Sequence, residues 1–190
     1  MGRLDLIIGP MYAGKSTELI RRAHRHRRAK KKVLCVKHKS DTRYSENKEI
    51  TTHEGQSMDC ITVGTIKDLD SIVQKYDVIC VDEGQFFSDI MSCVDYADKF
   101  DVHWIIAALN GDINRHAFGD IGKLEPMSDQ VDKISAICHR CANDAYFTSL
   151  IVLENDTGDV SDGSFVKVGG DETYKASCRK CYNAILREQL

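Results

Sequence analysis

The chain has 190 residues, of which 42% are hydrophobic and 29% charged, and its formal net charge at pH 7 is −3. This length suits one compact core of about 140 residues with a small appendage and excludes two large domains. The slightly negative charge gives no overall attraction to nucleic acid or anionic membranes, and no segment approaches the roughly 18 apolar residues of a membrane-spanning helix.

The first part of the chain predicts a strand, a helix and a second strand. Apolar residues 4–8 predict a buried strand, residues 15–29 a helix, and residues 33–37 another strand. Because a strand–helix–strand unit joins parallel strands, the sheet must be covered on both faces. The polar stretch 41–55 is predicted to be a loop. Since residues 4–8 include the acidic Asp5 and lead directly into a loop that begins at Gly9, we expect a core strand there and not a signal peptide.

The middle of the chain continues this alternation. Residues 66–76 have apolar side chains at helical spacing, residues 78–82 form an apolar strand, and residues 86–100 predict a helix before the strand 102–109. This pattern is typical of a doubly wound α/β sheet, in which ligands bind at the carboxyl ends of the strands.

A change in composition near residue 135 indicates two modules. Residues 1–134 are predicted to be an α/β domain, and residues 135–190 a second module with paired cysteines around a Gly- and Asp-rich stretch. The basic run 21–32 contains no aromatic residues, so a solvated helix face is favoured over a nucleic-acid patch.

The segment between the first strand and the first helix has the pattern Gly-x4-Gly-Lys-Ser. Its glycines let backbone N–H groups face a polyphosphate, the helix N-terminus adds positive potential, Lys15 reaches the β and γ phosphates, and Ser16 offers a hydroxyl to Mg2+. An ordinary glycine-rich turn is the alternative, which the strand-to-helix setting disfavours. The predicted nucleotide-binding residues here are Gly9, Pro10, Met11, Tyr12, Ala13, Gly14, Lys15 and Ser16.

Two carboxylates follow the strand 78–82. Asp82 takes the position from which phosphate-loop enzymes orient Mg2+, so the predicted magnesium pair is Ser16 and Asp82. Glu83 would point away from Asp82 on an extended strand unless the backbone turns, which Gly84 permits. Glu83 could then accept a proton from an attacking hydroxyl group. The alternative is that Glu83 complements the dipole of the next helix, and both roles can coexist.

Eight cysteines are present, and four form two Cys-x-x-Cys pairs. Two such pairs supply the four thiolates of a tetrahedral structural Zn2+ site, whereas a catalytic zinc would keep an open position. The predicted ligands are Cys138, Cys141, Cys178 and Cys181. The alternatives are a redox dithiol or unpaired buried cysteines. Cysteines in apolar runs elsewhere indicate a reducing compartment, so we expect a cytoplasmic protein.

Together, the phosphate loop, the run Asp-Glu-Gly-Gln-Phe-Phe at 82–87 and the divided Cys-x-x-Cys pairs resemble the small zinc-containing (type II) thymidine kinases. The resemblance runs end to end and includes Asp41-Thr42-Arg43-Tyr44 and Val168-Gly169-Gly170. It implies a P-loop (RecA-like) parallel sheet flanked by helices, with a small C-terminal zinc-ribbon-like module. In this family the long loop between the cysteine pairs covers the nucleoside as a lasso.

The resemblance implies transfer of the γ-phosphoryl group of ATP to the 5′-hydroxyl of thymidine, giving thymidine monophosphate and ADP for salvage synthesis of DNA precursors. Glu83 would be the catalytic base. Further residues of the ATP and Mg2+ site would be Asp41, Thr42, Arg43, Asp82 and Gln85. Thymidine would be bound by Phe86, Ile113, Phe118, Thr148, Phe165, Val166, Lys167, Val168, Gly169 and Tyr174. A homotetramer and inhibition by thymidine triphosphate (dTTP) are also implied, with no nucleic-acid or membrane partner.

Two positions depart from the family pattern. Ile113 stands where a phenylalanine is common beside the base, and Asn110-Gly111 stands where Asp-Gly is frequent. Two rival classes are disfavoured. A nucleic-acid-dependent ATPase needs a second RecA-like lobe or a basic groove, and neither 190 residues nor a net charge of −3 supplies it. A signalling GTPase needs an Asn-Lys-x-Asp guanine-binding motif, which this sequence lacks.

Overall fold

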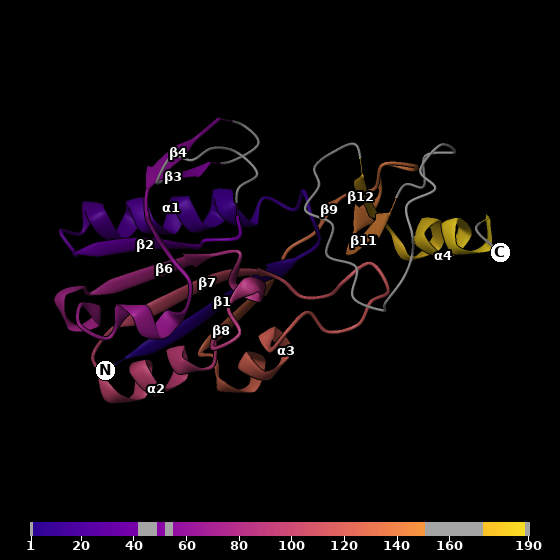
Figure 1. Cartoon of the computed structure of the whole chain (residues 1–190). Helices are drawn as coiled ribbons and strands as arrows, with labels where there is room; N and C mark the ends of the chain where they lie inside the picture. The colour runs from indigo at the N-terminus through magenta and orange to yellow at the C-terminus, as the bar shows by residue number, and fades with distance from the viewer. Residues whose placement is uncertain (1, 42–48, 52–54, 151–172, 189–190) are drawn as a thin grey trace.

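The computed structural model describes residues 2–41, 49–51, 55–150 and 173–188. Its centre is a six-stranded parallel sheet with the strand order β5-β2-β6-β7-β1-β8 (Figure 1). The strands are β1 (Arg3–Gly9), β2 (Val33–His38), β5 (Ile61–Val63), β6 (Val78–Asp82), β7 (His103–Leu109) and β8 (Gln130–Lys133). The predicted α/β fold, with a parallel sheet flanked by helices, is confirmed.

Helices cover both faces of this sheet. α1 (Lys15–Arg28) lies on one face, with the hairpin of β3 (Glu49–Thr51) and β4 (Ser57–Asp59) above it, and α2 (Ser92–Lys99) and α3 (Ile121–Leu124) lie on the other (Figure 1). Short 3-10 helices complete this part: η1 (Ile66–Leu69), η2 (Val73–Lys75), η3 (Gly84–Phe86) and η4 (Glu125–Met127). No bilayer-spanning helix is found among the described residues, whose longest helix, α1, has 14 residues.

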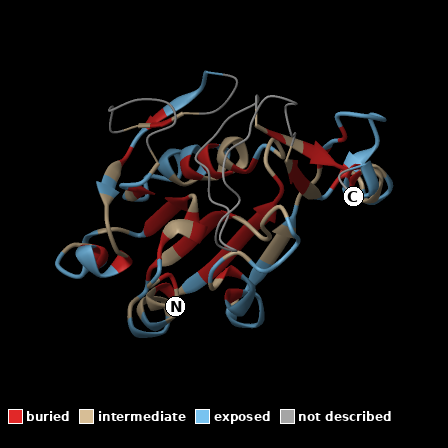
Figure 2. Cartoon of the chain, turned by 45° about the vertical axis from the view of Figure 1, so that its right-hand side comes forward, coloured by how far each residue is buried: buried red, intermediate tan, exposed pale blue. Residues whose placement is uncertain are grey.

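The unbroken apolar runs of the sequence reflect burial on both sides of the sheet. In β1, Leu6 packs into the core on the α2 face, whereas Ile7 packs against α1. In β7, Ile106 packs on the α2 face and Ile105 packs on the α1 face. Neighbouring side chains on a strand point to opposite faces, so most positions of a strand covered on both sides are apolar. Figure 2 shows the buried central strands and the exposed outer surfaces of the helices.

The C-terminal part contains short antiparallel pairs and one helix. Its elements are β9 (Ala136–Ile137), β10 (Asp144–Ala145), β11 (Phe147–Leu150), β12 (Tyr174–Ser177) and α4 (Arg179–Glu188). β9 pairs with β10, β11 pairs with β12, and α4 packs against β11 and β12. The central sheet ends at Lys133, so the predicted boundary between residues 134 and 135 falls between elements; two separate domains stay a prediction.

The predictions for the four central strands and for α1 are confirmed to within two residues. The loop predicted at 41–55 was wrong in part, because it contains β3. This strand has three residues, and only Ile50 is buried, against Met58 of β4. A strand this short has too few alternations to leave a pattern in the sequence.

Two predicted helices are also corrected. Residues 66–76 form η1 and η2 instead of one helix, with Ile66, Leu69 and Val73 still buried on one side. The helix predicted at 86–100 begins only at Ser92. Before it, the Asp89 carboxylate accepts hydrogen bonds from the backbone N–H groups of Ile66 and Lys67. These tertiary contacts hold the chain in turns, since they compete with continuous helical hydrogen bonding.

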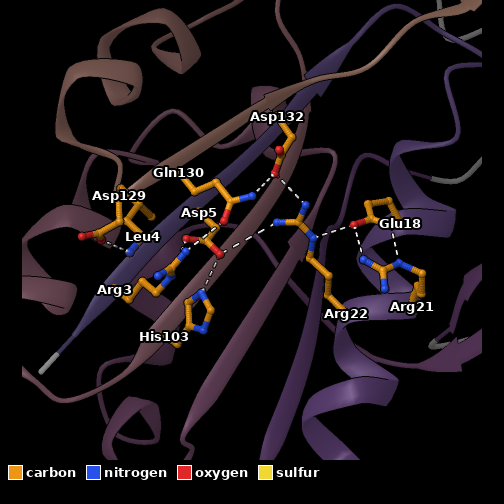
Figure 3. Close-up of polar contacts among 10 residues, drawn as sticks. All are labelled: Arg3, Leu4, Asp5, Glu18, Arg21, Arg22, His103, Asp129, Gln130 and Asp132. Atoms are coloured by element: carbon orange, nitrogen blue, oxygen red, sulfur yellow. Dashed lines mark hydrogen bonds and ion pairs between the residues drawn. The ribbon is translucent and has the colours of Figure 1, made fainter.

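A polar network fastens α1 to the sheet (Figure 3). Arg22 of α1 lies 2.6 Å from the Asp132 carboxylate of β8 and 2.8 Å from Glu18. Asp5 of β1 is buried, and its carboxylate lies 2.7 Å from Arg3 and 3.0 Å from His103. Because Arg22 joins the helix to an edge strand, the network sets the position of α1 on its face of the sheet.

Glu18 provides a test of this network. Hydrogen bonds from Arg21 and Arg22 lower the pKa of Glu18 from 4.5 to about 2. A lowered pKa means that the ionised carboxylate stabilises the fold above the unfolded pKa, and that this stability is lost as the pH falls through the folded pKa. After allowance for solvent screening, we expect Glu18→Gln to lower the free energy of unfolding at pH 7 by about 1 kcal/mol.

Urea unfolding at pH 7 and pH 3 measures this effect. The difference in the free energy of unfolding between Glu18→Gln and the parent should be smaller at pH 3 than at pH 7. Glu125→Gln, on the exposed side of η4, is the matched control and should leave the midpoint unchanged. Equal midpoints for Glu18→Gln and the parent at pH 7 would contradict the proposed contribution.

Candidate active site

The phosphate-loop residues curl between the end of β1 and the start of α1. Gly14 has φ = 78°, in the left-handed region that a side chain disfavours. A Cβ atom on Gly9 would lie 2.4 Å from the carbonyl oxygen of Ile134, so only glycine allows this close approach. Both glycines of the motif are therefore required by the backbone itself. The expected strand-to-helix setting of this motif is confirmed.

Lys15 and Ser16 open α1 and face polar partners. The Lys15 ammonium group is buried and donates a hydrogen bond of 2.7 Å to the carbonyl oxygen of Pro10. The Ser16 hydroxyl group lies 3.0 Å from each carboxylate oxygen of Asp82, at the end of β6. The structure thus brings the two predicted magnesium residues into direct contact. A hydroxyl and a carboxylate are hard oxygen ligands, as Mg2+ prefers.

The electrostatics around Asp82 also suit a cation. Burial, followed by the negative charges of Glu83 and Asp41, raises the pKa of Asp82 from 3.8 to about 7, against the opposing effects of Ser16 and Lys15. A divalent cation would favour the ionised carboxylate at this position. Asp41 therefore lies within electrostatic reach of Asp82, while Thr42 and Arg43 of the same predicted motif are outside the described residues.

Glu83 occupies a strained turn. Its φ and ψ are 52° and 45°, so the backbone turns at Glu83 itself and not at Gly84 as the sequence suggested. Gly84 has a different constraint, because a Cβ atom there would lie 2.7 Å from the Cγ2 atom of Ile106. Left-handed backbone at a residue other than glycine is uncommon and often marks functional positions. Glu83 is the N-cap residue of η3 and makes no side-chain capping bond, so the alternative that its charge complements the helix dipole stays a prediction.

Gln85 holds the Glu83 carboxylate. Its side-chain N–H donates to Glu83, and its side-chain oxygen accepts a 2.9 Å hydrogen bond from the backbone N–H of Leu109 in β7. Gln85 is buried, so this bridge is fixed by the core. The contact gives Gln85 a role in orienting Glu83, and its nucleotide-binding role stays a prediction.

Several predicted nucleoside-binding residues lie around the same edge of the sheet. The rings of Phe86 and Phe118 meet edge to face with centroids 6.2 Å apart. Thr148 of β11 is buried, and its hydroxyl accepts a 3.1 Å hydrogen bond from the backbone N–H of Met11 in the phosphate loop. The C-terminal part therefore contacts the nucleotide-binding loop directly.

Of the other predicted nucleoside-binding residues, the structure describes only Tyr174 and Ile113. Tyr174 is buried in β12 opposite Leu150 of β11. The carbonyl oxygen of Ile113 accepts a hydrogen bond from Tyr182 of α4, a residue that no sequence motif had singled out. The predicted lasso residues Phe165, Val166, Lys167, Val168 and Gly169 are outside the described residues.

The four motif cysteines form one cluster. The sulfur atoms of Cys138, Cys141, Cys178 and Cys181 all lie within 4.8 Å of one another, which suits a single tetrahedral metal ion. Burial opposes ionisation of Cys138, but backbone hydrogen bonds to its sulfur lower its pKa to about 6. Burial and the neighbouring sulfurs raise the pKa of Cys181 to about 12. A bound cation would relieve this repulsion, so the cluster fits structural zinc.

A variant in the second pair tests the zinc assignment. We expect the parent protein to contain about one zinc per chain and Cys178→Ser to lose most of it, because three thiolates and a hydroxyl bind zinc poorly. Elemental analysis of the purified proteins measures the zinc content. Cys60→Ala, in the core beneath α1, is the control and should retain zinc. Full zinc occupancy in Cys178→Ser would refute the four-thiolate site.

Comparisons with known proteins agree on one family. A family model described as thymidine kinase matches residues 2–182. The thymidine kinase of Sheeppox virus (strain KS-1) is 39% identical over 181 residues, which are 95% of this chain and 97% of the relative. The corresponding protein of Myxoma virus (strain Lausanne) is also 39% identical, with 95% and 96% covered. A cytosolic thymidine kinase of Cricetulus griseus is 36% identical, with 95% and 73% covered.

Proposed function

This chain belongs to the thymidine kinase family, and from that membership we propose that it transfers the γ-phosphoryl group of ATP to the 5′-hydroxyl group of thymidine. The products are thymidine monophosphate and ADP. The observation that supports this activity most directly is the contact of Ser16 with Asp82 beside Glu83, at the end of the phosphate loop. These residues join a phosphate site, a cation site and a base.

In this proposal the phosphate loop binds ATP through its backbone N–H groups. The Lys15 ammonium group exchanges the Pro10 carbonyl for the β and γ phosphates, and Ser16 and Asp82 would hold Mg2+. A bound Mg2+ would supply positive charge beside the phosphates and the buried Asp82 carboxylate. Asp41, Thr42 and Arg43 contribute to the same nucleotide site.

Glu83 serves as the general base. Its carboxylate accepts the proton of the 5′-hydroxyl as the oxygen bonds to the γ-phosphorus and the bond to the bridging oxygen of ADP breaks. Gln85 keeps the carboxylate in position through its hydrogen bond, while the left-handed backbone directs it out of the line of β6. A fixed base reduces the reorganisation needed for transfer.

The thymine base lies beside the aromatic pair of Phe86 and Phe118. Stacking and apolar contact favour a flat pyrimidine with a methyl group, and Ile113, Thr148 and Tyr174 complete the enclosure. The backbone of residues 165–169 supplies hydrogen bonds to the base edge. Such hydrogen bonds discriminate strongly, because a mismatched base leaves buried polar groups unpaired.

Further proposals concern the context of the reaction. We propose salvage synthesis of DNA precursors in the cytoplasm, a homotetrameric assembly, and feedback inhibition by dTTP, without a nucleic-acid or membrane partner. They rest on the family resemblance. Free, buried thiols at Cys35, Cys60, Cys80 and Cys93 suit a reducing compartment.

The activity is tested with ATP, Mg2+ and a panel of nucleosides. We expect thymidine to be phosphorylated in preference to the purine nucleosides, and Glu83→Gln to slow this transfer by about 10^2- to 10^4-fold while ATP and thymidine still bind. Quenched-flow measurement of a single turnover isolates the chemical step. Glu125→Gln is the control for removing one carboxylate. An unchanged rate in Glu83→Gln dismisses the base, and no phosphorylated thymidine in the parent dismisses the activity.

Asp82→Asn tests the cation site through stability. Because the pKa of Asp82 is raised to about 7, the protonated form stabilises the fold, and this stability is lost as the pH rises through 7. In magnesium-free buffer at pH 8.5, we expect the free energy of unfolding of Asp82→Asn to exceed that of the parent by about 2 kcal/mol.

Urea unfolding measures this gain, which should shrink at pH 6 and reverse when Mg2+ and ATP are added. Phosphoryl transfer by the variant should fall at the same time. Asp120→Asn, a surface change at the start of α3, is the control. Equal stability of Asp82→Asn and the parent at both pH values would argue against an uncompensated buried carboxylate.

A further inference from the structure

The loop that follows β7, residues 110–118, is a compact turn built around one aspartate. The Asp112 carboxylate accepts hydrogen bonds of 2.9 Å and 2.8 Å from the backbone N–H groups of Asn114 and His116. An antiparallel bridge between Gly111 and Ala117 closes the base of the loop. The loop carries Ile113 and ends at Phe118, whose ring packs on Phe86. Its conformation therefore determines where two predicted nucleoside-binding side chains lie.

Helix α4 holds the tip of this loop. The Tyr182 side chain is only 2% exposed, and its hydroxyl group donates a hydrogen bond to the carbonyl oxygen of Ile113. The Arg115 guanidinium group lies 4.5 Å from the centre of the Tyr182 ring, and its nitrogen lies 3.5 Å from the Asn183 side-chain oxygen. These contacts join residues about 70 positions apart in the sequence, so they fix the loop to the C-terminal module.

The backbone at the contact is strained. Arg115 has φ = 65°, a left-handed conformation that costs on the order of 1 kcal/mol outside glycine. Such a conformation persists when surrounding contacts hold it in place. The Arg115 guanidinium group over the Tyr182 ring supplies one contact. The hydrogen bond from Tyr182 to Ile113, two residues before Arg115, supplies another.

Tyr182 is itself positioned by the cysteine cluster. It follows Cys181 directly, and its backbone N–H donates a 2.9 Å hydrogen bond to the carbonyl oxygen of Cys178. Its ring packs 5.6 Å from Phe147 of β11, over which the Arg179 guanidinium group also lies. The phenol is therefore fixed by the same turn that carries two of the metal-binding thiols.

We propose that Tyr182, with Arg115, is a positioning residue for the nucleoside: it couples the four-cysteine site to the 110–118 loop and so sets the placement of Ile113 and Phe118. This inference rests on the proposed thymidine kinase activity. It gives the metal cluster a consequence for substrate affinity beyond holding the C-terminal module together. Ile113 and Phe118 can keep their positions only while the contacts of Tyr182 and Arg115 hold the loop.

Tyr182→Phe removes the hydroxyl group and keeps the ring for Arg115 and Phe147. We expect the KM for thymidine to rise by about fivefold, the usual effect of one lost hydrogen bond, while kcat, the KM for ATP and the zinc content stay within twofold of the parent. Tyr146→Phe, at a 39% exposed tyrosine of the same module, is the matched control and should change none of these values.

Arg115 provides an independent arm. Arg115→Ala should raise the KM for thymidine, and Arg115→Lys, which keeps a cation near the ring, should recover part of the loss. This graded recovery separates positioning from a general loss of folding, because misfolded protein would lower active-enzyme concentration and leave KM unchanged.

Two results would overturn the inference while leaving the proposed activity intact. One is an unchanged KM for thymidine in Tyr182→Phe when the parent phosphorylates thymidine. The other is a parallel loss of zinc and kcat in Tyr182→Phe at constant KM, which would make the tyrosine purely structural. A parent protein that fails to phosphorylate thymidine would overturn the proposed function and this inference with it.

Discussion

The contact between Ser16 and Asp82 is the interaction on which the rest of the site depends. It brings the first turn of α1 against the end of β6, although 66 positions separate the two residues. The parallel order β6-β7-β1 makes this contact achievable, since it places the ends of β1 and β6 on the same edge of the sheet. Burial makes the ionised Asp82 carboxylate costly and raises its pKa, so a cation beside it would be favourable.

Around that contact the structure holds the carboxylate of Glu83 by core hydrogen bonds. Gln85 joins Glu83 to the backbone of β7, and the left-handed turn at Glu83 redirects its side chain after the strand has ended. Strain of this kind is tolerated because the sheet on either side is buried and rigid. The same sheet therefore provides both the stability of the fold and the precision of the site.

The C-terminal module takes part in the site at two points. Thr148 accepts a hydrogen bond from the phosphate loop at Met11, and Tyr182 donates one to the loop after β7 at Ile113. The two contacts come from β11 and α4, which pack against each other in the C-terminal part. A metal ion at the cysteine cluster would stabilise the module and also restrain two loops at the carboxyl edge of the sheet, which links structural metal binding to substrate placement.

The central strands, α1, the phosphate loop and the four-cysteine cluster could be predicted from the sequence, because unbroken apolar runs, required glycines and Cys-x-x-Cys spacing are local signals. The other features come from contacts that form in the folded chain. The turns before α2 and the Tyr182 contact with Ile113 depend on partners distant in the chain. Ile50 of β3 and Met58 of β4 pack into a core shared with α1, and the left-handed backbone at Glu83 is a conformation that the local sequence does not favour. Such contacts leave no periodic pattern, since the residue types are common and only the fold makes them neighbours.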